Sequence, residues 1–429
     1  MDANKTDFCF DPRLFITPPF EDCPKCKEKK CFGVLSIYGQ SYIRRCNKCW
    51  YDESYSLPVL SKKIIYIDQF VISNMMKSIH PTFRITDKNN DFFKELFLKL
   101  EFLAKAHIVV CPESLIHYDE SIMSKRYCYD DIKEMYKYLS FGTSFLSIST
   151  ISRFHFVAAF RKYLTGVDDI KLKRETVCPR CNEWKDKLRI DVDCTTREAY
   201  KKEICDQKIR SLEALSLVFE DWKRIRPFVF EEIFKNELTS PAKFYLKNYY
   251  VFLKEFTKAQ FGIENNINRY ISDEALLTVR EMFNILEESQ IALSRYCELI
   301  DTFFKSNLML EVPNHRIESL LWTALARKAA SGQKKIKNIS IVNDIYAISS
   351  YMPYSDAIFI DKECHGLLDD VDVQKRIGCT TRVFSLKNKA EFIKYLDELI
   401  LNISEEHIAL IKQVYGEQWL EPFTSMYDI

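Results

Sequence analysis

Two short apolar runs in this chain each end on an aspartate, and this pattern constrains the fold more than any other. Residues 63–67 (KIIYI) precede Asp68, and residues 357–360 (AIFI) precede Asp361. A buried strand gains no stability from a carboxylate at its tip unless the charge meets a cation, a helix N-terminus or solvent. In open α/β sheets, ligands bind beyond the carboxyl ends of the strands. We therefore expect both aspartates at the ligand-binding edge of a parallel sheet.

Strand and helix patterns alternate in two blocks around these aspartates. The first block continues with a helix, an apolar strand and a second helix, over residues 92–105, 107–111 and 114–120. The second block has a helix, two strands and a last helix, over residues 339–350, 356–360, 382–386 and 389–401. This order predicts an α/β fold with a parallel sheet of about four or five strands flanked by helices.

Composition limits the class of protein further. The apolar fraction of 47% and the charged fraction of 29% are those of a globular chain, and nine glycines argue against glycine-rich nucleotide loops. The polar N-terminus and the lack of long apolar runs argue against a signal peptide and a membrane span. Fifteen cysteines without a secretion signal favour zinc-bound and free thiols in a reducing cytoplasm. The net charge of +1 means that any nucleic-acid surface must come from local clusters.

Two CxxC pairs near the N-terminus predict a structural zinc site. They are Cys23 with Cys26 and Cys46 with Cys49, and the segment between them has the pattern of a β-hairpin. Four thiolates held by two such turns complete a tetrahedral, closed zinc site, as in a Cys₄ ribbon. The ribbon also carries basic and aromatic residues that could bind nucleic acid or, equally, pack on a neighbouring domain: Arg44, Arg45, Lys48, Trp50 and Tyr51.

A third CxxC pair lies far downstream, at Cys178 and Cys181. Cys194 and Cys205 are the candidates for a third and fourth ligand, although their spacing is unusual for a zinc site. We expect a second structural zinc ion here.

Two further acidic residues lie on helices near the strand-ending aspartates. Glu120 falls near the second turn of the helix that begins at 114, and Asp344 falls in the first turns of the helix over 339–350. Together with Asp68 and Asp361, they would form an oxygen-rich site suited to Mg²⁺ or Mn²⁺.

The two blocks resemble the PIN-like nucleases, over about residues 60–125 and 315–400. The likeness rests on the motifs YIDQF, SLIHYDE, NDIYAIS and AIFIDKE. It implies that Asp68, Glu120, Asp344 and Asp361 are the metal-binding carboxylates, and that metal-activated water attacks a phosphodiester. Three other acids compete for these roles: Glu113, expected to cap a helix, Asp119, and Asp356, expected at the wrong end of its strand. His117, on the helix face of Glu120, is more typical of a structural histidine.

The interval between the blocks departs from the family, because compact members join these motifs through few residues. The expected boundaries are 1–58 for the zinc ribbon, 59–125 for the first part of the PIN-like core, 126–312 for a helical insertion and 313–429 for the second part. Helical periodicity in the insertion is strongest over residues 209–222, 242–256 and 275–304. The insertion could serve as a substrate lid, a sensing module, or a surface for self-association or a regulatory partner. Its basic residues are weak evidence for RNA contact: Lys171, Lys173, Arg174, Arg180, Lys223, Arg224 and Arg226.

Three functions compete on this evidence. The favoured one is a divalent-metal-dependent endonuclease acting on nucleic acid, with RNA as the preferred substrate, and analogy between folds suggests a toxin or antiphage role. The second is a non-catalytic scaffold that binds nucleic acid or protein, in which the acids have lost their role. A phosphatase would need a DxD signature after Asp68, where Gln69 and Phe70 follow, and no phosphate-binding loop of an ATPase is present.

Overall fold

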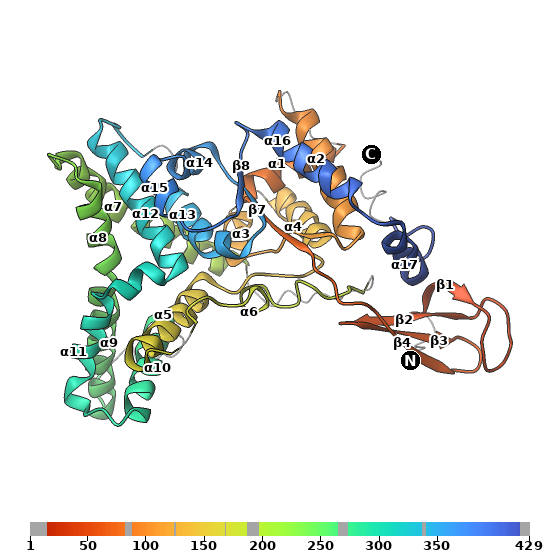
Figure 1. Cartoon of the computed structure of the whole chain (residues 1–429), viewed down its shortest axis with the longest axis horizontal. Coiled ribbons are helices and arrows are strands. Elements are labelled where there is room, and N and C mark those ends of the chain that lie inside the picture. The colour runs from red at the N-terminus through yellow and green to blue at the C-terminus, as the bar shows by residue number, and fades with distance from the viewer. Residues whose placement is uncertain are drawn as a thin grey trace, which may run out of the picture.

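The computed structural model describes residues 15–81, 88–123, 126–167, 169–186, 197–264, 273–336 and 340–420. It contains an antiparallel sheet at one end, a parallel sheet in the middle and an arm of helices at the other end (Figure 1). None of the described helices is both long and apolar enough to cross a membrane.

The antiparallel sheet is formed by the N-terminal residues. Its strands β1 (Thr17–Glu21), β2 (Phe32–Tyr38), β3 (Ser41–Cys46) and β4 (Asp52–Ser56) lie in sequence order. The expected hairpin is β2–β3, and Gly39 at its turn has a φ of 61°, a conformation that glycine adopts without strain. The sheet lies beside the helix α17 (Glu405–Tyr415) near the C-terminus (Figure 1).

The central sheet has four parallel strands in the order β6-β5-β7-β8. The strands are β5 (Lys63–Ile67), β6 (Val109–Val110), β7 (Ala357–Phe359) and β8 (Arg382–Phe384). This confirms an α/β fold with a short-stranded parallel sheet. Strands β5 and β7 come from the two distant blocks of sequence, yet they pair directly, with Ile65 opposite Ala357 and Ile67 opposite Phe359.

Two hydrophobic cores cover the two faces of this sheet, because successive strand residues point to opposite sides. Ile65 and Ile67 face a core built with the helices α1 (Gln69–Ile79), α2 (Asn90–Lys105), α4 (Arg126–Ser140) and α16 (Lys389–Leu401). Ile64 and Tyr66 face the other core, which continues into the helical arm. Helix α4 falls within the range expected for the insertion, but its apolar side chains pack on the sheet.

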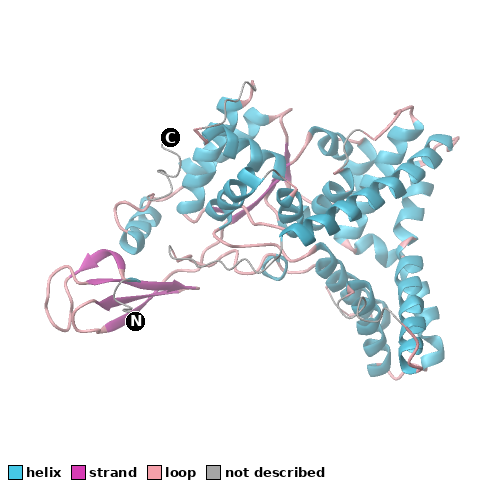
Figure 2. Ribbon diagram, turned by 180° about the vertical axis from the view of Figure 1, so that it is seen from behind, coloured by secondary structure: helices cyan, strands magenta, loops and turns pink. Residues whose placement is uncertain are grey.

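The second core is made largely of helices from the insertion and from the C-terminal block (Figure 2). They are α3 (Leu115–Ile122), α5 (Ile148–Thr165), α6 (Arg174–Val177), α7 (Arg197–Arg224), α8 (Phe230–Thr239), α9 (Pro241–Gln260), α10 (Glu274–Glu288), α11 (Tyr296–Phe304), α12 (Pro313–Ala330), α13 (Ile341–Tyr351), α14 (Lys362–Leu368) and α15 (Val371–Arg376).

The segment 275–304 is largely helical, as its periodicity predicts, but the chain divides it into two helices, α10 and α11. Gln290 has a φ of 56°, and its N–H donates to the Glu287 carbonyl, while the N–H of Ile291 donates to Leu286. These two bonds close the left-handed cap that ends many helices. Glycine usually occupies this position, so a glutamine there gave no signal in the sequence.

Candidate functional site

The two strand-ending aspartates lie side by side at the carboxyl edge of the central sheet. The N–H of Asp68 donates to the Phe359 carbonyl at 3.0 Å and so extends the β5–β7 pairing. Each carboxylate also caps the helix that follows it. Asp68 accepts a hydrogen bond from the N–H of Phe70 at 3.2 Å, and Asp361 accepts one from the N–H of Cys364 at 2.6 Å. Both side chains are therefore held by the strand–helix junctions that the sequence pattern predicts.

Asp344 and Glu120 reach the same edge from the helices α13 and α3. Asp344 accepts a hydrogen bond from Ser340 Oγ at 3.0 Å, and a ligand atom of Asp344 lies within 4.8 Å of ligand atoms of Asp361 and Cys364. Asp68 and Glu120 lie outside this tightest group, but both raise the pKa of Asp344. We call Asp68, Glu120, Asp344 and Asp361 the carboxylate cluster.

Burial and the charges of neighbouring acids make three members of the cluster, Asp68, Asp344 and Glu120, hard to ionise. Asp68 and Asp344 are only 9% and 7% exposed, and burial, followed by the charges of neighbouring acids, raises the pKa of both well above the ordinary range. Burial also raises the pKa of Glu120 to about 7, although nearby Lys208 opposes the shift. Acids gathered in this way are a common sign of a functional site.

The cluster fits a divalent cation. Among the described residues, no group forms a hydrogen bond with Glu120 Oε1 or with the buried hydroxyl of Tyr136, and that hydroxyl lies in the field of Glu120 and Asp68. Buried polar atoms of this kind are rare in a folded protein unless a ligand or water satisfies them. Mg²⁺ and Mn²⁺ prefer carboxylate oxygens, and either ion would offset the repulsion.

Three side chains near the cluster carry no motif in the sequence. Cys364 is fully buried beside Asp344 and Asp361. Lys208 on α7 lowers the pKa of Glu120 and of Asp119, and so brings a positive charge from the insertion to the cluster. Lys328 on α12 is half-buried and lies in the field of Glu363 and Cys364. The sequence marks Cys364 only as one of its fifteen cysteines, and only tertiary contacts single out the two lysines.

The residues that compete for these roles have other partners. Asp356 lies at the opposite end of the sheet, as expected, where it accepts a hydrogen bond from the N–H of Ile64 at 2.9 Å and pairs with Arg174. The expectation that Glu113 caps a helix is wrong. Ser114 caps α3, and Glu113 accepts a hydrogen bond from Ser140 Oγ at 2.8 Å.

Asp119 and His117 share α3 with Glu120. Asp119 accepts a hydrogen bond from the hydroxyl of Tyr200 at 2.7 Å. His117 stacks between Tyr66 and Tyr136, with ring centroids 5.1 and 4.8 Å apart, and burial lowers its pKa to about 3. His117 is therefore a neutral core residue.

The N-terminal sheet brings together the four thiols expected to bind zinc. Ligand atoms of Cys23, Cys26, Cys46 and Cys49 lie within 4.8 Å of one another, with sulfur separations of 3.6 Å for Cys23–Cys49 and 3.7 Å for Cys26–Cys46. Sulfurs bound tetrahedrally to zinc lie about 3.8 Å apart, so these four residues could hold Zn²⁺. Burial opposes ionisation of Cys46, but hydrogen bonds from the backbone of Cys49 and Lys48 outweigh it and lower its pKa to about 6.

A fifth thiol, Cys31, belongs to the same corner of the sheet. Its sulfur lies 3.4 Å from Cys46 Sγ and donates to the Glu28 carbonyl at 3.1 Å. Burial and the neighbouring Cys46 raise the pKa of Cys31 to about 11, so this thiol stays protonated as a donor.

No family model, curated protein or solved structure matches this chain. Its function must therefore be inferred from these sites.

The second zinc site is not supported by the described residues. Cys178 and Cys181 lie together, but Cys205 Sγ lies 3.6 Å from Met123 Sδ, and no three metal-ligating side chains gather at Cys178 and Cys181 within the described ranges. Cys194 lies outside the described residues. The buried Lys62 lies in the field of both thiols, and its ammonium donates to the Glu183 carbonyl at 2.7 Å.

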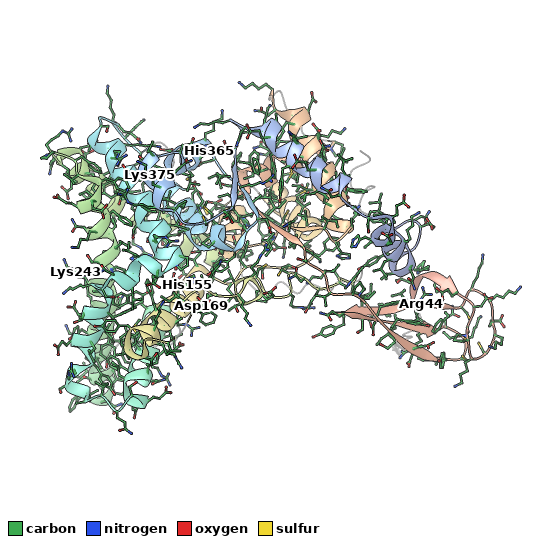
Figure 3. All side chains as sticks on the ribbon, viewed as in Figure 1. Arg44, His155, Asp169, Lys243, His365 and Lys375 are labelled. Atoms are coloured by element: carbon green, nitrogen blue, oxygen red, sulfur yellow. The ribbon has the colours of Figure 1, made fainter. Side chains whose placement is uncertain are left out.

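Of the two roles left open for the basic residues of the ribbon, Arg44 has the packing role. Arg44 is 1% exposed, donates to the carbonyls of Pro19, Phe32 and Gln413 at 3.1–3.4 Å, and pairs with Glu21. It therefore fastens the N-terminal sheet to α17. Figure 3 shows Arg44 inside this sheet, remote from Lys243 in the helical arm.

Charge pairing also neutralises other basic residues of the expected patches. Arg45 pairs with Asp52 at 2.8 Å, and Arg174 pairs with Asp356. Arg180 and Glu183 form an ion pair at 2.5 Å, and Lys223 and Glu220 one at 2.6 Å. The expected patches are therefore weaker anion-binding surfaces than the sequence alone indicates.

Proposed function

We propose that this protein is a divalent-metal-dependent nuclease of the PIN-like kind, with RNA as its preferred substrate. The observation that supports it most is the gathering of four acids from four separate elements at the carboxyl edge of a parallel sheet. A structural role for these acids would call for cations beside each of them, because a buried carboxylate is costly without one. A metal-dependent nuclease, in contrast, needs acids gathered in this way to bind its cation.

The chain's own residues would divide the work. Asp344 and Asp361, with Asp68, would hold the cation, since the last two are fixed as helix caps and cannot easily turn away. A bound Mg²⁺ or Mn²⁺ would supply an activated water molecule and neutralise charge on the phosphate. Glu120, with a pKa of about 7, would be suited to accept a proton from an attacking water molecule, while the P–O bond to the leaving sugar oxygen breaks and that oxygen takes a proton from solvent.

Two lysines would hold the phosphate backbone of the substrate. Lys208 lies beside Glu120. Lys328 lies over Gly366 of α14, where its ammonium is 3.5 Å from the position that a Cβ would occupy on this glycine. Lys387 approaches the same glycine at 3.9 Å. Lys208 lies in the field of Glu120, and Lys328 lies in the field of Cys364, the neighbour of Asp344 and Asp361, so a polyanion could meet the acids without unscreened repulsion.

The decisive experiment uses a circular single-stranded RNA, since a circle can be opened only by an endonuclease. Protein stripped of loosely bound divalent ions on a chelating resin should not cleave it, and added Mn²⁺ or Mg²⁺ should restore cleavage. Asp68→Asn and Asp361→Asn should each lose most of the activity, because each removes a metal ligand at nearly constant volume. A matched control is Asp221→Asn, an exposed acid of the insertion that pairs with Arg224.

A circular DNA of the same sequence tests the substrate class, and zinc content and thermal unfolding show that each variant is folded. Cleavage that persists in both variants, or that needs no divalent ion, would show that the carboxylate cluster is not a nuclease site. Binding of RNA without cleavage under all conditions would favour the scaffold.

A further inference from the structure

A cavity of about 730 Å³ opens beside the carboxylate cluster and lies outside the chemistry described so far. Its walls come from α3 and α13, which carry Glu120 and Asp344, from the insertion helices α5, α7, α9 and α10, and from α12 of the C-terminal block. The volume is in the range of pockets that hold small organic ligands, about 300–1,000 Å³.

Three helices connect the cavity to the carboxylate cluster, each through two consecutive residues. Asp119, Gln207 and Asn343 line the cavity, and each directly precedes a residue of the cluster or its cation: Glu120, Lys208 and Asp344. Neighbouring residues of a helix point about 100° apart, so each helix presents one side chain to the cavity and the next to the acids. A ligand that spans both would meet the two sites at once.

The walls of the cavity are aromatic. Tyr245 and Tyr346 lie in the field of Glu318, and Phe244, which also lines the cavity, is 58% exposed. An exposed aromatic ring in a cavity wall is a surface on which a planar ligand can stack.

Four carboxylates also line the cavity, and three of them have partners. Asp119 accepts from Tyr200, Asp273 caps α10, and Glu274 pairs with Arg153 at 2.6 Å. Glu318 differs, because no Lys or Arg pairs with it among the described residues. It accepts a hydrogen bond from the side chain of Trp322. Burial raises the pKa of Glu318 to about 7, so a ligand with N–H donors would stabilise its ionised form.

We propose that this cavity binds a nucleobase of the substrate strand, with guanine preferred. This inference rests on the proposed function, in which the adjoining phosphate lies at the carboxylate cluster. Guanine presents two adjacent donors, N1–H and N2–H, on its Watson–Crick edge, and a carboxylate offers two acceptors to match them. None of the described residues lining the cavity is Lys or Arg, so the cavity itself does not suit a phosphate.

The test measures binding of the four nucleosides to full-length protein by calorimetry, in buffer freed of divalent ions. Nucleosides are used because an added phosphate would meet the un-neutralised acids. Guanosine should bind more tightly than adenosine, cytidine and uridine. Glu318→Gln should weaken the binding of guanosine on the order of tenfold and reduce the preference among bases, because an amide presents one acceptor oxygen and one NH₂ donor where the carboxylate presents two acceptor oxygens. Glu288→Gln, an exposed acid at the end of α10, should change nothing.

A second variant guards against misfolding of the first. Phe244→Ala removes an exposed ring. It should weaken the binding of all four nucleosides to a similar extent, because any of the four bases can stack on an aromatic ring. If no nucleoside binds, or if guanosine binds equally well to the wild type and to both variants, the cavity is not a base pocket. Metal-dependent cleavage without base preference would overturn this inference alone. Base binding without any cleavage would overturn the proposed nuclease and leave the pocket in place.

Discussion

Asp344 and Asp361 place ligand atoms within 4.8 Å of each other, although one lies in the first turn of a helix and the other follows a strand. Two ionised carboxylates so close repel, and the repulsion grows with their burial. In the metal-free protein this repulsion therefore lowers the stability of the fold, and one substitution can remove it.

Asp344→Asn should consequently have opposite effects with and without metal. In metal-free buffer the variant should melt above the wild type, because a repelling charge is gone. Saturating Mn²⁺ should reverse the order, since a ligand at one hundred times its Kd stabilises a protein by about 2.7 kcal/mol and the variant binds more weakly. Thermal unfolding followed by circular dichroism measures both. Equal responses to Mn²⁺ would exclude Asp344 as a ligand.

The stability of the metal-free protein should fall as pH rises from about 5 to 8. The folded pKa of Glu120 is raised to about 7, chiefly by burial, so between its ordinary value and pH 7 the folded state holds a proton that the unfolded state has released. The proton-linked stabilisation is largest at low pH and is lost through this window, with an upper limit of about 3 kcal/mol. Urea unfolding at several pH values tests this. Glu120→Gln should flatten the curve, and an unchanged slope would contradict the assignment.

Purified protein should contain about one equivalent of zinc bound by the N-terminal sheet. Cys23→Ser combined with Cys26→Ser should remove it and destabilise that sheet, whereas Cys178→Ser should leave the zinc content unchanged. Elemental analysis of dialysed samples gives both answers. Retained zinc in the double variant would mean that Cys31 or another thiol replaces the lost ligands.

Arg44 and Arg45 are neighbours whose substitutions should destabilise the protein to very different extents. Arg44→Met removes the buried guanidinium that donates to three carbonyls, one of them buried and two part-buried, and should lower the free energy of unfolding by about 3 kcal/mol. Arg45→Met breaks an ion pair with the half-exposed Asp52 and should cost less than about 1 kcal/mol. Chemical denaturation of the two variants compares them directly. Similar losses would show that Arg44 is not a structural fastener.

Lys208→Met should weaken RNA binding and make it less sensitive to salt. Each phosphate contact contributes about one unit to the slope of log affinity against log salt, so the slope should fall by about one. The control is Lys202→Met, an exposed lysine on the same helix. Fluorescence anisotropy at several salt concentrations provides the measurement. Equal slopes for all three proteins would remove Lys208 from the substrate path.

The sequence predicted those parts of the fold and of the candidate site that local patterns encode. Asp68 and Asp361 follow apolar runs, so their strands, their helix-capping positions and their shared edge could be anticipated. Lys208 and Lys328 could not, because their positions depend on how α7 and α12 pack. For Arg44 the sequence left a nucleic-acid surface and packing equally open, and only the tertiary structure reveals its partners.

Strand β7 also bears on how the protein is made, because it stands between β5 and β8. Lys63 at the start of β5 pairs with Asp356 just before β7, and these residues are 293 apart in sequence. While the ribosome is translating the chain, β5 and Asp68 emerge long before their partner strand exists. Contacts so distant in sequence form late and slowly. The carboxylates can meet only after Asp361 has been synthesised, so under the proposed function a shorter nascent chain would be inert towards the message that encodes it.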